Sequence, residues 1–91
     1  RAAVEATPDN GTAWLGLAAS YDQLGRFDLA DRAYAQLLKL EGAKASILNN
    51  QGYSYILRGD MKQARKVLSN AHALAPDNIV IEGNLKLANK A

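Results

Sequence analysis

Residues 47–78 read ILNNQGYSYILRGDMKQARKVLSNAHALAPDN, two apolar-periodic segments separated by a short break at Gly59. Apolar residues that recur every three or four positions form one face of a helix. Gly59 follows the first segment, and glycine adopts the left-handed conformation of a helix end at little cost. Pro76 follows the second segment and cannot easily continue a helix. The stretch therefore predicts a helix, a turn and a second helix.

The same arrangement occurs earlier in the chain. Pro-Asp-Asn stands at residues 8–10 and again at 76–78, a sequence interval of 76 − 8 = 68, and Gly42 occupies the midpoint. Shifting the chain by half of that interval, 34, aligns apolar with apolar and small with small residues. The aligned pairs are Ala18 with Gly52, Tyr21 with Tyr55, Gly25 with Gly59, Ala30 with Ala64, Tyr34 with Leu68 and Leu40 with Leu74. The chain therefore consists of repeated helix–turn–helix units.

Helix ends follow from the breakers and capping residues between the apolar segments. The expected helices are 12–24, 28–41, 45–58, 62–74 and 79–90. Asp28 is the expected N-cap of the second helix, and Asn10 or Thr12 is that of the first. The residues expected in the core, where small and large side chains interlock, are Trp14, Tyr21, Ala30, Tyr34, Tyr55, Ala64 and Leu68.

These residues resemble the tetratricopeptide repeat, whose pattern is W-x2-L-G-x2-Y, then A-x3-F, then P within about 34 residues. The first unit supplies Trp14, Leu17, Ala18, Tyr21, Ala30 and Tyr34, with Gly42 where proline is usual. The second unit supplies Leu48, Gln51, Gly52, Tyr55, Ala64, Leu68 and Pro76. The resemblance implies an all-α fold, a right-handed superhelical stack of antiparallel helix pairs.

The resemblance also implies how the chain is divided. Residues 1–91 would form a single repeat domain, a fragment of a longer protein, with two full repeats and partial repeats at both ends. The parts would be 1–10, the end of a preceding repeat, 11–44, repeat one, 45–78, repeat two, and 79–91, a closing helix.

Composition limits the classes of function. The chain has no cysteine and one histidine, which is a poor basis for a metal site. His72 lies among apolar residues without an evident partner, as is typical of a packed structural residue. The serines lack the Gly-x-Ser-x-Gly context of an activated nucleophile, and no glycine-rich phosphate loop precedes a helix. We therefore expect no catalytic residue, no metal and no cofactor, and a protein that is not an enzyme.

The net charge is +2, and the basic excess lies in the second unit, where Lys62, Arg65 and Lys66 share one face of the expected helix 62–74. Such residues usually cover a solvated surface. No aromatic residues interleave with these charges, so the pattern disfavours nucleic acid as a partner. No apolar run approaches the roughly 18 residues that a membrane span needs. The partner expected for this chain is a protein or peptide segment.

In the tetratricopeptide family the first helix of each repeat lines a concave groove that binds partners. The family's groove positions fall here on Asn49, Asn50, Tyr53, Leu57, Asn84, Leu15, Ala19 and Gln23, the candidate partner-binding residues, and also on Asp22. Members that clamp a terminal carboxylate use a lysine and an asparagine where Leu15 and Ala19 stand, so a carboxylate clamp is not expected. Asn50 and Asn84 can donate and accept hydrogen bonds along a bound backbone, and Tyr53 can supply a flat apolar contact. The alternative is that these side chains only cap, solvate or pack between helices.

The run from residue 47 to residue 78, with residues 14–34 before it, also resembles the repeat protein of bacterial tight-adherence (Flp) pilus assembly. Members of that group are typically outer-membrane lipoproteins that face the periplasm and assist secretin assembly, so the resemblance implies an assembly factor in that compartment. A second class of function stays open, a structural module whose repeats stack on another copy to give a homo-oligomer. Its basis is the apolar surface near Thr12 that an incomplete preceding helix would leave exposed.

Overall fold

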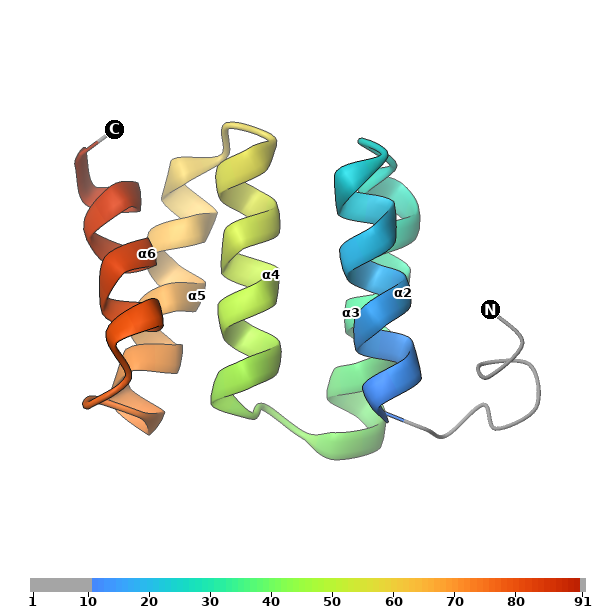
Figure 1. The fold of residues 1–91 in the computed structure, drawn as a ribbon, viewed down its shortest axis with the longest axis horizontal. Helices are drawn as coiled ribbons and strands as arrows, with labels where there is room; N and C mark the ends of the chain where they lie inside the picture. Colours follow the sequence, from blue (N-terminus) through green and yellow to red (C-terminus); the bar gives the residue numbers. More distant parts are fainter. Residues whose placement is uncertain (1–10, 91) are drawn as a thin grey trace. The chain divides into compact units, whose positions relative to one another are not determined.

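The computed structural model describes residues 11–90, which form helices joined by short turns (Figure 1). The helices are α2 (Gly11–Gln23), α3 (Phe27–Glu41), α4 (Ala45–Leu57), α5 (Met61–Leu74) and α6 (Ile79–Lys90). They belong to two compact units, which we call unit one (Arg1–Gly42), with α2 and α3, and unit two (Ala43–Ala91), with α4, α5 and α6. Within each unit, consecutive helices run antiparallel (Figure 1).

The helix positions expected from the sequence are confirmed to within one residue at each end. The expected all-α fold of antiparallel helix pairs is also confirmed for the described residues. The expected end of a preceding repeat at residues 1–10, with Asn10 as a cap, lies outside the described residues. The self-stacking alternative rests on that same segment.

The helices α2 and α4 end in the same hydrogen-bonded turn. Gly25 and Gly59 have φ angles of 73° and 83°, the left-handed conformation that the sequence predicts. At the end of α2, the Arg26 N–H donates to the Tyr21 carbonyl at 2.8 Å, and the equivalent bond at the end of α4 measures 2.9 Å. This bond across six residues is the mark of the Schellman motif, which satisfies carbonyls that lack a partner at a helix end. Both helix pairs therefore reverse direction by the same local mechanism.

The Pro-Asp-Asn sequence at residues 76–78 forms a turn and then starts a helix. The Asn78 N–H donates to the Ala75 carbonyl at 3.1 Å, which closes a four-residue turn with proline at its second position. The side-chain Oδ1 of Asn78 accepts from Val80 N at 2.9 Å and from Ile81 N at 3.1 Å. These N–H groups belong to the first turn of α6 and have no partner within the helix. The tripeptide therefore closes one helix pair and caps the next helix.

Two capping predictions are wrong. Asp28 is not the N-cap of α3, because it lies inside the first turn of that helix. The turn before the second helix has the same length in both units, so Arg26 occupies the cap position that Asp60 holds in unit two. Asp60 does cap α5, since its Oδ1 accepts from the backbone N–H three residues later at 3.2 Å. Thr12 is likewise inside α2 rather than in front of it.

The core of unit two forms around Leu68 of α5, which is fully buried. Gly52 of α4 faces this side chain so closely that a Cβ atom at Gly52 would lie 2.5 Å from Leu68 Cγ. Ala64 of α5 and Ala88 of α6 belong to the same cluster and are also fully buried. Small residues from three helices thus surround one leucine, which lets the helices pack closely.

Four of the seven residues expected in the core are buried, namely Ala30, Tyr34, Ala64 and Leu68. The other three, Trp14, Tyr21 and Tyr55, are only half-buried, which corrects the prediction. Trp14 and Tyr21 belong to α2, and α3 is the described helix that packs on α2 in unit one. Tyr55 packs against the core of unit two, and the Arg58 guanidinium carbon lies 4.7 Å from its ring centroid. Large amphipathic rings therefore stand at the border of each core.

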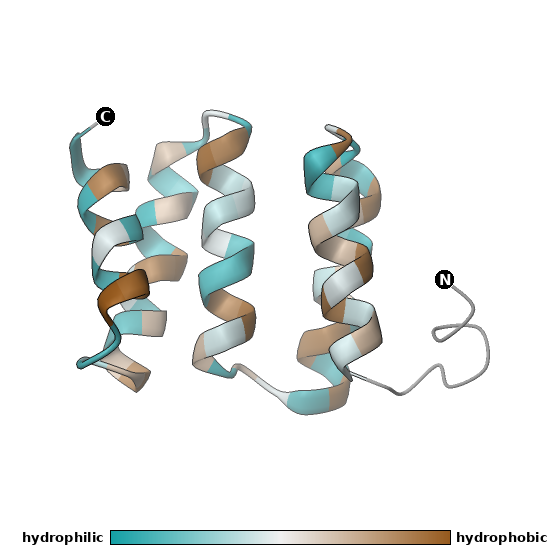
Figure 2. Cartoon of the chain, in the orientation of Figure 1, coloured by the Kyte–Doolittle hydropathy of each residue, from teal (hydrophilic) through white to brown (hydrophobic). Residues whose placement is uncertain are grey.

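Hydrophobic and hydrophilic residues alternate along each helix, as expected of helices that bury one face (Figure 2). The first turn of α6 is an exception, because it is strongly hydrophobic and yet exposes Ile79 and Val80 (Figure 2). None of the described helices combines the length and the apolar character that a membrane span requires.

Replacing Gly52 by Ala should destabilise the protein, because Leu68 is fully buried and has little room to move away from the new methyl group. We expect overpacking to cost about 1–3 kcal/mol, more than the roughly 1 kcal/mol that alanine gains over glycine in a helix. Urea unfolding followed by circular dichroism measures the difference. The matched control is Gly83→Ala in α6, where a Cβ would meet nothing within 4 Å and where stability should rise. Equal rises for both variants would show that α4 and α5 are not in close contact at Gly52.

Replacing Asn78 by Ala should remove the acceptor of two backbone N–H groups at the start of α6. The expected cost is about 0.5–2 kcal/mol of unfolding free energy, the usual range for loss of an asparagine cap. Asn70→Ala, an exposed position inside α5, is the control and should change stability little. If the two variants unfold at the same urea concentration, Asn78 does not cap α6 in solution.

Candidate functional site

The helices α4 and α6 lie side by side in unit two, and an amide pair joins them. Asn84 Nδ2 of α6 donates to Asn49 Oδ1 of α4 at 2.9 Å. Both side chains are half-buried. The bond uses one group of each amide, so Asn49 Nδ2 remains as a donor and Asn84 Oδ1 remains as an acceptor. The pair therefore presents the same two functions as a peptide group.

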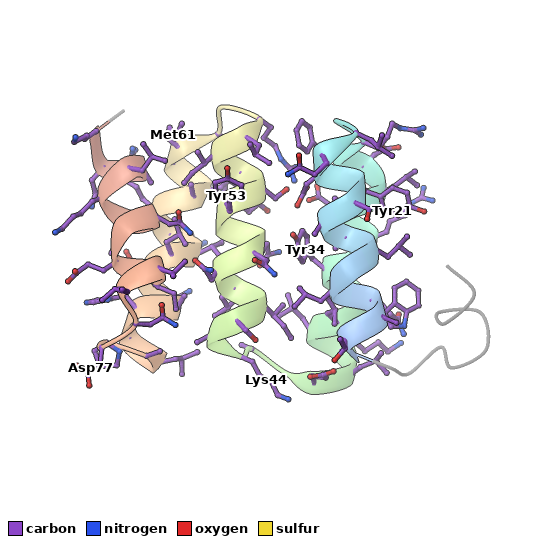
Figure 3. All side chains as sticks on the ribbon, in the orientation of Figure 1. Tyr21, Tyr34, Lys44, Tyr53, Met61 and Asp77 are labelled. Carbon is purple, nitrogen blue, oxygen red and sulfur yellow. The ribbon has the colours of Figure 1, made fainter. Side chains whose placement is uncertain are left out.

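Large apolar side chains flank this amide pair on both helices. On α4, Tyr53 and Leu57 are 40% and 42% exposed and follow the asparagine by four and eight residues. On α6, Val80 and Leu87 are 60% and 47% exposed, four residues before and three after the asparagine. Residues with this spacing lie on one face of a helix, and Figure 3 shows Tyr53 on α4. We call this surface the neutral face, made of Asn49, Asn50, Tyr53 and Leu57 of α4 with Val80, Asn84 and Leu87 of α6.

The structure brings the unit-two candidates of the sequence analysis together on the neutral face. Asn50, which is half-buried, lies next to the amide pair in sequence. In unit one, the candidates Leu15, Ala19 and Gln23 follow one another at intervals of four along α2, so they share one flank of that helix. Leu15 is half-buried, and the other two are exposed. Their part in binding stays a prediction.

Asp22 is not a groove residue, which corrects the sequence-based expectation. It is only 7% exposed, and its Oδ2 accepts a hydrogen bond from the Tyr34 hydroxyl at 2.7 Å. A buried phenol needs a hydrogen-bond partner, and Asp22 supplies it. The repeat alignment contained a signal for this bond, because Asp22 aligns with Ile56 and Tyr34 aligns with Leu68. An apolar pair in one unit thus corresponds to an acid and a phenol in the other.

The basic residues of α5 do not all cover a solvated face. Lys62 and Lys66 are exposed, as expected, but Arg65 is half-buried. Its Nη1 donates to the Ala88 carbonyl at 3.2 Å. That carbonyl lies in the last turn of α6, where carbonyls lack helical partners and a cation is favourable. Arg65 therefore ties α5 to the end of α6.

His72 lies half-buried on α5. Its Nδ1 atom is buried and has no hydrogen-bond partner among the described residues. Across residues 11–90, no three His, Cys, Asp or Glu side chains come together in a way that could hold a metal ion. The arrangement assigns no ligand or proton-transfer role to His72.

Most of the chain matches a model of a known protein family. A family model described as tetratricopeptide repeat matches residues 1–30 and, in a second and overlapping match, residues 20–79. The two matches together extend over residues 1–79, which is more than half of the 91 residues. A search of curated proteins found no significant match.

The amide pair can be tested by a double-mutant cycle with Asn49→Ala and Asn84→Ala. Because the two side chains share one hydrogen bond, the double variant should lose less stability than the sum of the single variants. The expected coupling is about 0.5–1.5 kcal/mol, the usual net contribution of a neutral hydrogen bond, measured by urea unfolding. Asn70→Ala combined with Asn84→Ala is the control and should be additive. Additive losses for both pairs would mean that the bond does not form in solution.

Proposed function

The chain belongs to the tetratricopeptide repeat family, and from this premise we propose that it is a non-catalytic scaffold module that binds a segment of another protein. Repeats of this family generally mediate protein–protein interaction, and arrays of helix pairs present an extended surface for it. The helices α2, α4 and α6 begin at residues 11, 45 and 79, at intervals of 34, so each opens a repeat. The division into repeats 11–44 and 45–78 with a closing helix 79–91 is part of this proposal.

The observation that carries the proposal is the exposed apolar content of the neutral face. Tyr53, Leu57, Val80 and Leu87 all lie on the side of unit two that carries the amide pair. A solvated surface has no physical need for four large apolar side chains in one place, whereas binding surfaces gather them. Tyrosine in particular is enriched among the residues that contribute most to binding. We therefore infer that the neutral face is the partner-binding surface of unit two.

The chemistry of the neutral face specifies the kind of segment that it would accept. None of its seven residues is charged, so a partner gains nothing from placing a carboxylate or an ammonium group there. Asn49 Nδ2 and Asn84 Oδ1 have no hydrogen bond to another residue among residues 11–90, and they match the acceptor and the donor of a peptide group in the partner. A segment with apolar side chains on both sides of one accessible peptide or amide group fits best.

The flank of α2 that carries Leu15, Ala19 and Gln23 is proposed as a second contact surface, in unit one. It combines an apolar, a small and an amide side chain and is uncharged, like the neutral face. The two surfaces would favour partners of the same chemistry.

A narrower form of the proposal is an assembly factor of a bacterial tight-adherence (Flp) pilus, located in the periplasm and anchored to the outer membrane. Its support is the resemblance of residues 47–78 to the repeat protein of that system. The test is to immobilise the purified chain and measure retention of the pilus secretin from a strain that makes the pilus. Retention by the wild-type chain and loss with Tyr53→Ala would support this role. Secretin that is not retained, and that assembles equally well in a strain lacking the protein, would contradict it.

Replacing Tyr53 by Ala should weaken binding of a partner segment more than it weakens folding. We expect affinity to fall about 30-fold, which corresponds to roughly 2 kcal/mol, the threshold for a dominant interface residue. Unfolding free energy should fall by less than about 1 kcal/mol, because the side chain is already 40% exposed. The probes are peptides selected from a random library against the wild-type chain and then measured by fluorescence anisotropy.

The matched control for Tyr53→Ala is Leu74→Ala, an exposed apolar position at the end of α5 and outside the neutral face. Peptides that bind the neutral face should keep their affinity for this variant. If most selected peptides lose affinity for Leu74→Ala and keep it for Tyr53→Ala, the neutral face is not the binding surface.

A further inference from the structure

The charge of unit two is concentrated at one end. Residues 43–91 contain seven Lys or Arg and three Asp or Glu, a net charge of 7 − 3 = +4. Lys44 and Asp77, at the opposite end, cancel. Glu82 lies in the first turn of α6, and the remaining six basic residues and Asp60 lie around the α4–α5 turn, the first half of α5 and the second half of α6, a net charge of 6 − 1 = +5. We call this surface the basic end: Arg58, Lys62, Arg65, Lys66, Lys86 and Lys90.

The helix directions bring these residues together. The α4–α5 turn, the start of α5 and the end of α6 all lie at the same end of unit two (Figure 1), where Figure 3 labels Met61. The bond from Arg65 Nη1 to the Ala88 carbonyl, at 3.2 Å, links the two helices there. The basic side chains of α5 and α6 therefore form one surface and not two separate ones.

The acidic residues Asp60 and Glu82 of unit two do not neutralise this surface. Asp60 accepts a hydrogen bond at the start of α5 as its N-cap. Glu82 lies 4.0 Å from Lys86 in a pair that is largely exposed. In the described part of the chain, no carboxylate pairs with Lys62, Lys66 or Lys90. The three lysines thus keep their charge available to a partner.

Fold stability accounts for part of this charge, because Arg65 bonds the end of α6, Arg58 lies over the Tyr55 ring and Lys90 is in the last turn of α6, but it gives no reason for Lys62 and Lys66. Lys62 and Lys66 are four residues apart on one helix, and like charges at that spacing are destabilising. Lys62 is also in the first turn of α5, where the helix dipole disfavours a cation. The lysines fit a surface that meets an anionic partner better than one that only faces water.

We propose that the basic end docks onto an anionic lipid surface. Clusters of four to eight Lys and Arg bind membranes that contain acidic lipids, because each contributes to attraction by the negative surface potential. Leu57, the last residue of α4, and Leu87, in the last turn of α6, are exposed at the same end and can enter the interfacial region of a bilayer. A nucleic acid would use the charges but would leave these two apolar side chains without a role. Leu57 and Leu87 also belong to the neutral face, so lipid binding and partner binding would compete for these two side chains, whereas the lysines serve lipid binding alone.

The test is sedimentation of the full chain with vesicles of phosphatidylcholine containing about one third phosphatidylglycerol. The chain should bind these vesicles at low ionic strength, dissociate as salt is added and not bind pure phosphatidylcholine. Replacing Lys62, Lys66 and Lys90 together by Gln should lower the partition coefficient by about 100-fold, since each charge contributes roughly fivefold. Circular dichroism checks that the variant is folded, as expected for three exposed side chains.

The matched control is Arg26→Gln, Arg32→Gln and Lys39→Gln, which removes three exposed charges from unit one and should leave vesicle binding nearly unchanged. Three results would overturn the proposal: no binding to anionic vesicles at low salt, equal loss of binding in both triple variants, or tighter binding to polyglutamate or single-stranded DNA than to the vesicles.

Discussion

The contact between Gly52 and Leu68 is the constraint on which unit two depends. The absence of a side chain at Gly52 lets the backbone of α4 come within van der Waals distance of a buried leucine on α5. The same leucine packs with Ala88 of α6, so its position also fixes where α6 can lie. The amide pair between α4 and α6, and with it the geometry of the neutral face, follows from that arrangement. The proposed binding surface of unit two thus depends on a buried contact made by the same helices.

Unit one solves the same packing problem with different residues. The repeat equivalents of Gly52 and Leu68 are Ala18 and Tyr34, both buried. A tyrosine ring fills more space than leucine but carries a hydroxyl that must be hydrogen-bonded once it leaves water. The Asp22 carboxylate accepts the hydrogen bond of this hydroxyl, and Asp22 is therefore buried and not exposed to solvent. Repeats that share a fold therefore do not expose the same set of residues, because one core substitution is accompanied by burial of a residue on the neighbouring helix.

The features that could be predicted from the sequence are those that local chemistry determines. Helix ends and the left-handed glycines depend on residues within one or two turns, so the breakers at Gly25 and Gly59 located them correctly. The inward turn of Asp22, the bond from Arg65 to α6 and the amide pair depend on residues 12, 23 and 35 positions away. Hydrophobic periodicity predicts which face of a helix a residue occupies. It does not predict which residue of a neighbouring helix contacts it. Comparison between repeats can indicate such distant contacts. Two positions that both change between repeats, as Asp22 and Tyr34 change to Ile56 and Leu68, indicate side chains that contact each other.

The turn at residues 75–78 also bears on how such a chain can change in length. The hydrogen bonds described there, from the carbonyl of Ala71 to the N–H of Glu82, are made within twelve consecutive residues. The conformation of such a turn is therefore determined by local sequence. None of these hydrogen bonds uses a side chain from another part of the chain. If recombination duplicates or deletes one whole repeat at this turn, the new junction regenerates the same bonds without further mutation. The number of repeats can therefore vary during evolution more readily than the sequence within any one of them.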